Sequence, residues 1–188
     1  MEEEYDLLGV YILGLATAFG GGAIRNLLIG VPVSALWEQG TLFLMAVIVM
    51  TIVFVFPNLI LKRWEKWGLY TDAMGLAAFA IQGALYATEM NHPIFAVIIA
   101  ALLTGSGGGV IRDLLAKRKP LLLHTDIYGV WAMLAGLVIG LEWANQHWEL
   151  YLLFILIVAL RILTVFYNWK LPYRSIRGSH VSFKISNH

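Results

Sequence analysis

The chain has 188 residues, of which 60% are hydrophobic and only 13% are charged, and its formal net charge is +1. A soluble domain carries about 25% charged residues, so this composition indicates an integral membrane protein. The near-neutral charge gives no indication of a nucleic-acid partner, and the absence of cysteine excludes disulfides and thiolate metal sites.

Six apolar segments are predicted as helices that cross a bilayer, a distance that takes about 20 apolar residues. In chain order they are 7–29, 41–61, 71–88, 93–116, 127–141 and 148–167. Six of the seven tryptophans lie at or just outside the ends of these segments, as in an interfacial aromatic belt. We therefore expect an all-α membrane protein with one transmembrane domain over 1–172 and a polar cytoplasmic tail over 173–188.

Lysine and arginine are confined to one side of the predicted membrane topology. With six crossings, the N-terminus, the second and fourth loops and the C-terminus share one side, which holds ten of the 13 lysines and arginines. The loops on the other side hold none. An excess of this kind marks the cytoplasmic side, so we expect a cytoplasmic C-terminus. The remaining three basic residues, Arg25, Arg112 and Arg161, lie inside predicted spans.

Two near-copies of one motif lie 87 residues apart inside these spans. Residues 20–28 read Gly-Gly-Gly-Ala-Ile-Arg-Asn-Leu-Leu, and residues 107–115 read Gly-Gly-Gly-Val-Ile-Arg-Asp-Leu-Leu. Each glycine weakens a helix by roughly 1 kcal/mol relative to alanine, and an arginine within the bilayer costs about 2.5–3.5 kcal/mol. The first copy runs outward and the second inward, so the motif predicts an inverted repeat with a site near the midplane.

The repeat divides the chain into repeat one over 1–61, repeat two over 71–142 and a last helix over 148–167. The second motif is preceded by a helix at 71–88, whereas nothing corresponds to it before the first motif. A three-plus-three arrangement therefore predicts a first helix that is missing from this chain of six spans, through truncation or through the choice of start site.

The glycine triplets are the main candidate pore residues, and two interpretations of them stay open. Small residues allow helices to pack closely. Three glycines in a row bare the whole circumference of a helix, which favours a kink or an unwound turn with free carbonyl oxygens beside a watery cavity. Two threonines also match across the repeat and either offer hydroxyl oxygens to the path or bond to their own helix. The candidates are Gly20, Gly21, Gly22, Gly107, Gly108, Gly109, Thr17 and Thr104.

The two motif arginines are candidate gating or bracing residues. Arg112 has Asp113 as its nearest potential partner, whereas the corresponding neighbour of Arg25 is the neutral Asn26. In the alternative interpretation these long side chains snorkel to the headgroups. A static arginine in a pore disfavours the passage of cations, so a gating or bracing role is favoured over coordination of the ion.

Other polar or small residues within the spans have weaker interpretations. Asp72 either caps its helix or contributes a charge to the path, and Gln82 either lines the path or bonds a neighbouring helix. Arg161 is expected at a subunit contact or at the cytoplasmic interface. Gly136 and Gly140 form a GxxxG pair, a weak signal for tight packing.

The chain has no arrangement typical of an enzyme. Its histidines lack metal-ligand spacing and no serine lies in a nucleophile elbow. We therefore expect no catalysis, no cofactor and no metal other than transient K⁺ or Na⁺.

The twin motifs, together with Asp-Ala-Met-Gly-Leu-Ala-Ala-Phe-Ala at 72–80, resemble the prokaryotic trimeric intracellular cation (TRIC) channel family, parts of which are also called glycine-transporter-domain proteins. The resemblance extends over about 6–172. It implies a homotrimer in a prokaryotic plasma membrane, with three-plus-three inverted repeats, a last helix and one monovalent-cation pore per protomer. This chain departs from the family pattern at Asn26 and in the missing first helix.

The favoured function is a passive K⁺ or Na⁺ channel, whose partners are further copies of the chain, membrane lipid and the permeant ion. The alternative is a secondary transporter of glycine or a similar small zwitterion. A third hypothesis is a membrane scaffold in which the glycines serve only for packing.

Overall fold

The computed structural model describes residues 6–120, 122, 127–167 and 169, with the backbone alone for 57–66. These residues form helices and no strand, in agreement with the all-α prediction, and the predicted tail at 173–188 lies outside them. The elements are α1 (Leu7–Ile29), the 3₁₀ helix η1 (Val33–Glu38), α2 (Gly40–Val55), α3 (Pro57–Glu89), α4 (Ile94–Leu115), α6 (Tyr128–Gly140) and α7 (His147–Phe166).

Local sequence signals define the ends of several helices. The Asp6 carboxylate accepts a hydrogen bond of 2.7 Å from the Gly9 N–H and caps the start of α1. Gly30 ends the same helix with φ 79°, in the left-handed region that suits glycine. At the start of α7, the Glu149 carboxylate accepts a bond of 2.8 Å from the Gln146 N–H.

The sequence-based prediction misplaces the boundary between the second and third spans. The segment predicted at 41–61 ends at Val55, and α3 begins at Pro57 rather than at 71. Proline ends the preceding helix because it has no N–H to donate and is well placed at a first helical position. Asp72 consequently lies inside α3 and does not cap it.

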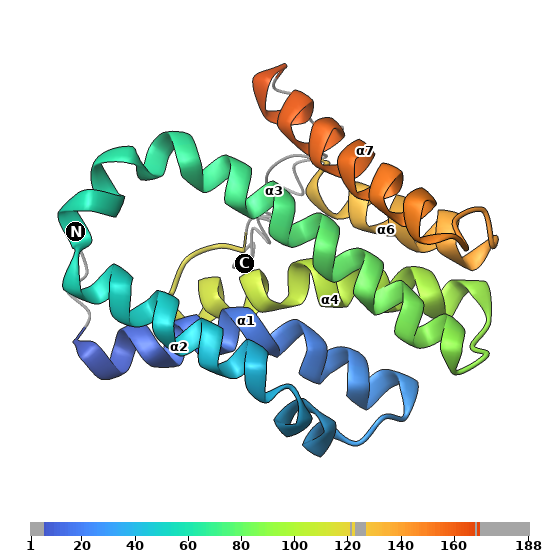
Figure 1. Ribbon diagram of the computed structural model, residues 1–188, viewed down its shortest axis with the longest axis horizontal. Coiled ribbons are helices and arrows are strands. Elements are labelled where there is room, and N and C mark those ends of the chain that lie inside the picture. The colour runs from blue at the N-terminus through green and yellow to red at the C-terminus, as the bar shows by residue number, and fades with distance from the viewer. Residues whose placement is uncertain (1–5, 121, 123–126, 168, 170–188) are drawn as a thin grey trace, which may run out of the picture.

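Helix α3 is longer than a bilayer requires. Its 33 residues would extend about 50 Å if straight, against a hydrocarbon thickness of about 30 Å. The first half of α3 curves along the edge of the fold, and the second half packs on α4 (Figure 1).

Helix α4 lies in the middle of the fold (Figure 1). It packs against α1 on one side and against α3 and α6 on the other, while α7 packs on α3 and α6 and α2 lies beside α1. The seam between α3, α4 and α6 is rich in small residues, which let helix backbones approach closely. Its fully buried alanines are Ala73, Ala77, Ala80, Ala84, Ala87, Ala101, Ala132 and Ala135.

The exterior is apolar, as expected of an integral membrane protein. Within the described residues, α1, α4 and α7 are long and apolar enough to cross a membrane, and α2 and α6 are shorter apolar helices. Most large apolar side chains of α2 are exposed, and Met50 is its buried residue. Lipid is the environment in which such a surface is stable.

The two helices that carry the repeated motif run antiparallel to each other through the centre of the protein (Figure 1). Their extensive contact joins the two halves of the chain. This arrangement confirms the inverted repeat that the charge pattern predicts.

Candidate functional site

The glycine triplets meet each other at the contact between α1 and α4, and they do so reciprocally. A Cβ atom built on Gly21 would lie 2.6 Å from the Thr104 carbonyl oxygen. A Cβ atom built on Gly108 would overlap the carbonyl oxygen of Thr17. Gly21 and Gly108 correspond at the 87-residue spacing of the repeat, as do Thr17 and Thr104, so each contact is the repeat counterpart of the other. Neither glycine has space for a side chain.

The first glycine of each triplet also faces the opposing helix. A Cβ on Gly20 would lie 2.5 Å from the Ile111 Cδ1 atom. A Cβ on Gly107 would lie 3.1 Å from the Gly21 Cα atom and 3.8 Å from the Ile24 Cδ1 atom. The two isoleucines also correspond in the repeat, so backbone and side-chain packing both follow the internal symmetry.

Both triplets are fully helical, which corrects the expectation of an unwound turn. Helices α1 and α4 run unbroken through residues 20–22 and 107–109. The physical reason is that the opposing backbone occupies the space that side chains would need, and close helix packing offsets the low helix propensity of glycine. Close packing, the alternative interpretation, therefore explains Gly21 and Gly108.

The last glycine of each triplet instead faces a cavity. Gly22 lines a first cavity, and a Cβ there would lie an ordinary 3.5 Å from the Leu36 Cδ2 atom. Gly109 lines a second cavity, where the nearest atom would be Arg112 Nη2 at 4.0 Å. These two positions leave open space beside the packed contact.

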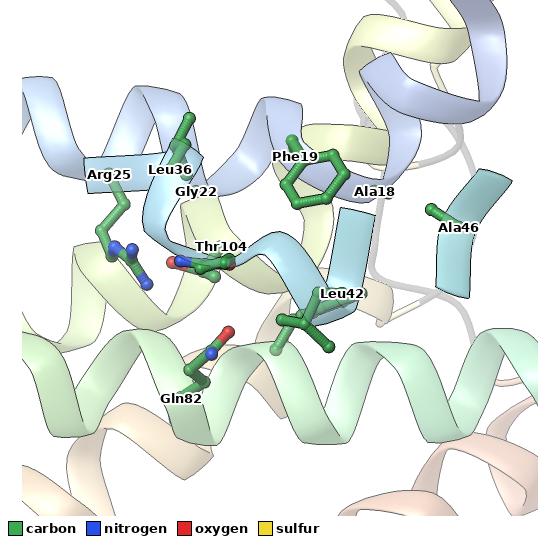
Figure 2. Close-up of a pocket in the computed structure, with 11 residues that line it drawn as sticks. Ala18, Phe19, Gly22, Arg25, Leu36, Leu42, Ala46, Gln82 and Thr104 are labelled. Atoms are coloured by element: carbon green, nitrogen blue, oxygen red, sulfur yellow. The ribbon is translucent and has the colours of Figure 1, made fainter. Parts of the chain in front are cut away.

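Two cavities in the protein share part of their lining. The first has a volume of about 190 Å³ (Figure 2) and is lined by Ala18, Phe19, Gly22, Arg25, Leu36, Gln39, Leu42, Ala46, Phe79, Gln82 and Thr104. The second, of about 550 Å³, includes Thr17, Asp72, Phe79, Thr104, Gly108, Gly109, Arg112, Tyr128 and Arg161 in its lining. Thr104 of α4 and Phe79 of α3 line both cavities.

The threonines of the repeat both bond to their own helix. Thr17 Oγ1 donates to the Leu13 carbonyl and Thr104 Oγ1 to the Ala100 carbonyl, each at 2.6 Å. The hydroxyl proton is used in these bonds, so the oxygen lone pairs are available as acceptors. Both residues line a cavity. The back-bonded geometry is therefore compatible with an acceptor role.

Arg25 is buried without an acidic partner in the described part of the chain. Its side chain is 2% exposed, and Nε and Nη2 donate to the Asn26 Oδ1 atom at 3.0 and 2.7 Å. The guanidinium carbon lies 4.2 Å from the centre of the Tyr86 ring. The buried Nη1 atom makes no hydrogen bond with any residue that the structure describes. An amide dipole and an aromatic face, rather than a carboxylate, thus surround this charge.

Arg112 bonds to its neighbouring residue with the same geometry as Arg25, but its partner is a charged carboxylate instead of a neutral amide. Its Nε and Nη2 atoms donate to the Asp113 Oδ1 atom at 3.0 and 2.9 Å and form an ion pair. The arginine side chain is 40% exposed and the carboxylate 9%. Asp113, the expected partner of Arg112, is confirmed as such. The two copies of the motif therefore share one shape but differ by one negative charge.

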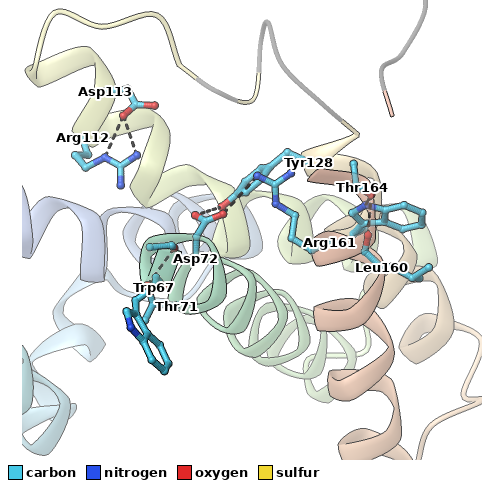
Figure 3. A network of polar contacts seen from close by, with 11 residues as sticks. Trp67, Thr71, Asp72, Arg112, Asp113, Tyr128, Leu160, Arg161 and Thr164 are labelled. Carbon is cyan, nitrogen blue, oxygen red and sulfur yellow. Dashed lines mark hydrogen bonds and ion pairs between the residues drawn. The ribbon is translucent and has the colours of Figure 1, made fainter. Parts of the chain in front are cut away.

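A polar cluster that the sequence does not predict lines the second cavity (Figure 3). The Tyr128 hydroxyl donates to Asp72 Oδ1 at 3.2 Å, and Arg161 Nη2 lies 3.6 Å from Asp72 Oδ2. The Arg161 guanidinium carbon lies 4.6 Å from the centre of the Tyr128 ring. Arg161 is 5% exposed, so it packs inside the protomer and does not face a subunit contact. The signal in the sequence for the contact of Asp72 with Arg161 was the presence of opposite charges within two predicted spans.

Comparison with known proteins identifies the family to which the chain belongs. A family model described as glycine transporter matches residues 1–58 and 69–144. The UPF0126 membrane protein YvgT of Bacillus subtilis (strain 168) is 67% identical over 177 residues, which cover 94% of this chain and 88% of that relative.

Solved structures of channels have the same fold. One concerned with the structural basis for conductance through TRIC cation channels matches with a TM-score of 0.80 and 36% identity, over 93% of this chain and 87% of that one. The TRIC trimeric intracellular cation channel orthologue from Rhodobacter sphaeroides matches with a TM-score of 0.75 and 29% identity, over 87% and 86%. The chain therefore belongs to the family of UPF0126 membrane proteins and prokaryotic TRIC channels, whose model is described as glycine transporter.

Proposed function

We propose that the protein is a passive channel for K⁺ and Na⁺, with one pore through each protomer. The observation that carries this proposal is the pair of cavities that approach each other at Thr104 and Phe79, beside the contact of α1 with α4. The similarity to two structures of cation channels, at 36% and 29% identity, supports it. In this function the protein carries out transport and no catalysis.

The path runs from the second cavity, on the side that the charge pattern predicts to be cytoplasmic, to the first cavity on the outer side. Asp72 supplies a carboxylate on the wide inner cavity. The hydroxyl oxygens of Thr17 and Thr104 and the amide oxygen of Gln82 follow along the route. Neutral oxygens of this kind replace part of the hydration shell of a monovalent ion.

Phe79 is the barrier between the two cavities. The half-buried Phe79 lines both spaces, as Thr104 does. A hydrophobic constriction closes a pore by excluding water, and it conducts when the opening widens enough to become wet. Movement of α3 relative to α4 is the motion that would change this opening.

The motif arginines favour monovalent over divalent cations. An uncompensated charge such as Arg25, at ~6 Å from a passing K⁺ and with an effective dielectric constant of about 20, adds roughly 3 kcal/mol to the energy of the ion. The cost is about twice as large for a divalent ion. Arg112 adds less because Asp113 neutralises it. Both arginines therefore act in gating or bracing rather than in coordination of the ion.

The second candidate is a secondary transporter of glycine or a similar zwitterion. The description of the family model favours it, as does a guanidinium on a cavity of about 190 Å³. Carrier function requires the two halves to move relative to each other around the site. The backbone-to-backbone contact of Gly21 and Gly108 disfavours such motion.

Purified protein in liposomes distinguishes the two functions. Unitary currents carried by K⁺ support the channel, whereas saturable glycine uptake without unitary currents supports the transporter. Thr104→Val keeps the shape of the side chain but removes the hydroxyl oxygen, and we expect it to lower K⁺ conductance severalfold.

Thr88→Val is the matched control for that substitution. The Thr88 hydroxyl also donates to its own helix, at 3.0 Å from the Ala84 carbonyl oxygen, but the residue lines neither cavity. Equal conductance of the two variants and the wild type would contradict a path past Thr104.

The assembly that we propose is a homotrimer in the plasma membrane of a bacterium or archaeon, with the C-terminus in the cytoplasm. The trimeric orthologue from Rhodobacter sphaeroides and the membrane protein of Bacillus subtilis support this assignment. Mass measurement in detergent is expected to give three chains per particle. A reporter that is active only in the cytoplasm is expected to be active when it is fused after His188.

A further inference from the structure

The two copies of the motif differ in how the charge of their arginine is compensated, and this difference points to a ligand. Arg112 has a carboxylate of its own chain at 2.9 Å. Arg25, which is 2% exposed, has an amide oxygen at the same position. A buried charge is costly unless an opposite charge accompanies it. No acidic residue that the structure describes forms an ion pair with Arg25, so a bound anion is a candidate for the compensating charge.

The space for that charge lies beside Arg25. The first cavity has a volume of about 190 Å³, and among the described residues that line it Arg25 is the charged one. Arg25 on α1 and Gln82 on α3 extend towards this space from opposite helices (Figure 2). Apolar side chains, including Phe19 and Leu42, form much of the remaining wall. A low-dielectric wall strengthens the attraction between a guanidinium and an anion.

We propose that the first cavity binds a small monovalent anion, a halide or a carboxylate group, against the guanidinium of Arg25. A halide accepts N–H donors of the guanidinium, and a carboxylate binds the same planar group through two oxygens. The Gln82 amide supplies a further N–H donor. The single positive charge of the site selects a monovalent ligand. In the second copy the carboxylate of Asp113, which belongs to the chain itself, neutralises Arg112 in place of a bound anion.

Anion binding has a consequence for transport, and this consequence alone rests on the proposed channel function. A bound anion neutralises Arg25 and so lowers the barrier that a cation meets in the first cavity. The current of K⁺ would then depend on which anion is present. Binding itself does not depend on which solute crosses the membrane, so it is tested without a flux measurement.

The test uses thermal unfolding of the full chain in detergent at constant ionic strength. Potassium gluconate, whose anion is larger and more strongly hydrated than the ligands tested, is the reference. Chloride, bromide or acetate replaces gluconate, and glycine is added to the gluconate buffer, in separate titrations. We expect a saturable rise in the unfolding temperature of the wild type with at least one of these solutes. A response to chloride and bromide identifies a halide site, and a response to acetate or glycine identifies a carboxylate site.

Asn26→Asp is the decisive variant because it retains the arginine and supplies the internal carboxylate found in the second copy. It is expected to lose the anion-dependent rise completely. Asn91→Asp makes the same chemical change in an exposed turn and is expected to respond like the wild type. A wild type that responds to none of the four solutes, or an Asn26→Asp variant that responds equally, would overturn the proposal.

Bromide scattering provides a measurement that needs no variant. For a halide site, crystals of the wild-type protein soaked in potassium bromide are expected to show an anomalous peak beside the Arg25 guanidinium. For a carboxylate site, crystals soaked in acetate or glycine are expected to show that ligand at the same position. Absence of bromide, acetate and glycine from that position would refute the site. Anion binding without K⁺ conductance would leave this proposal in place and contradict the channel, so the two proposals fail separately.

Discussion

The Cα atom of Gly108 lies directly against the carbonyl oxygen of Thr17, at a position that has no space for a Cβ atom. The same relationship recurs between Gly21 and the carbonyl oxygen of Thr104. These contacts join the two halves of the repeat through their backbones, and they set the distance between the helices that flank both cavities. The glycines are therefore required for the architecture of the path, even though their helices are not unwound.

Gly108→Ala is expected to destabilise the protein. The obstructing atom belongs to the backbone of α1, which has no rotamer with which to avoid the new methyl group. Overpacking of this kind costs about 1–3 kcal/mol, which exceeds the gain of roughly 1 kcal/mol in helix propensity. The midpoint of thermal unfolding in detergent measures the effect.

Gly109→Ala is the control for this substitution, because the nearest atom to its Cβ would be Arg112 Nη2 at 4.0 Å. It is expected to unfold at the same temperature as the wild type or slightly above it. A larger loss of stability in Gly109→Ala than in Gly108→Ala would contradict the packing described for this contact.

Gly136→Ala is expected to be more harmful than Gly140→Ala. A Cβ on Gly136 would lie 2.7 Å from the Ile98 Cα atom in the backbone of α4, whereas one on Gly140 would lie 3.0 Å from the Ile94 Cγ1 atom. The isoleucine side chain has freedom to move and the backbone does not. We expect a cost of about 1–3 kcal/mol for the first variant and less than about 1 kcal/mol for the second. Equal unfolding temperatures would refute this ranking.

Asp72→Asn is expected to weaken both stability and conduction. The substitution removes a negative partner of Arg161, which is 5% exposed, and the loss of one partner of a buried charged group costs about 1–3 kcal/mol. It also removes the carboxylate from the inner cavity, so K⁺ conductance in liposomes should fall. Both properties are measured on the same preparation.

Asp113→Asn is the comparison variant for Asp72→Asn. Its partner Arg112 is 40% exposed, and water screens the charge that remains, so the loss of stability should be under about 1 kcal/mol. An effect on stability as large as that of Asp72→Asn would show that the second ion pair matters more than its exposure indicates.

Phe79→Ala is expected to raise K⁺ conductance because it removes the ring that separates the two cavities. Met74→Ala, on an exposed position of the same helix where the side chain is 51% exposed, should leave conductance unchanged. Single-channel recordings of the two variants test the prediction. Unaltered conductance in Phe79→Ala would place the barrier elsewhere.

Much of the fold follows from sequence patterns that act locally or by symmetry. The apolar segment at 7–29 coincides with α1, and the segment at 93–116 differs from α4 by one residue at each end. Asp6 and Gly30 carry the cap signals of α1 within the chain itself. The 87-residue repeat and the one-sided distribution of basic residues predict the inverted pair of motif helices. Long hydrophobic segments are the signals least affected by tertiary contacts.

Other features depended on contacts between residues far apart in the chain. Composition alone favours an unwound turn at three consecutive glycines, because their propensity is counted without the opposing helix. The packing of α1 against α4 reverses that outcome. The extension of α3 back to Pro57 also differs from the hydropathy pattern, since helices continue into polar segments once their apolar part is anchored.

The sequence by itself determined that the protein is a helical membrane protein with an inverted repeat, since hydrophobic length, charge distribution and motif spacing are properties of the chain. Only the tertiary structure decided that Asp72, Tyr128 and Arg161 share one cavity and that Phe79 and Thr104 line both this cavity and that of Arg25. Those relationships arise where α3, α4, α6 and α7 cross. The distance between side chains on different helices is set by packing geometry, which spacing along the chain does not encode.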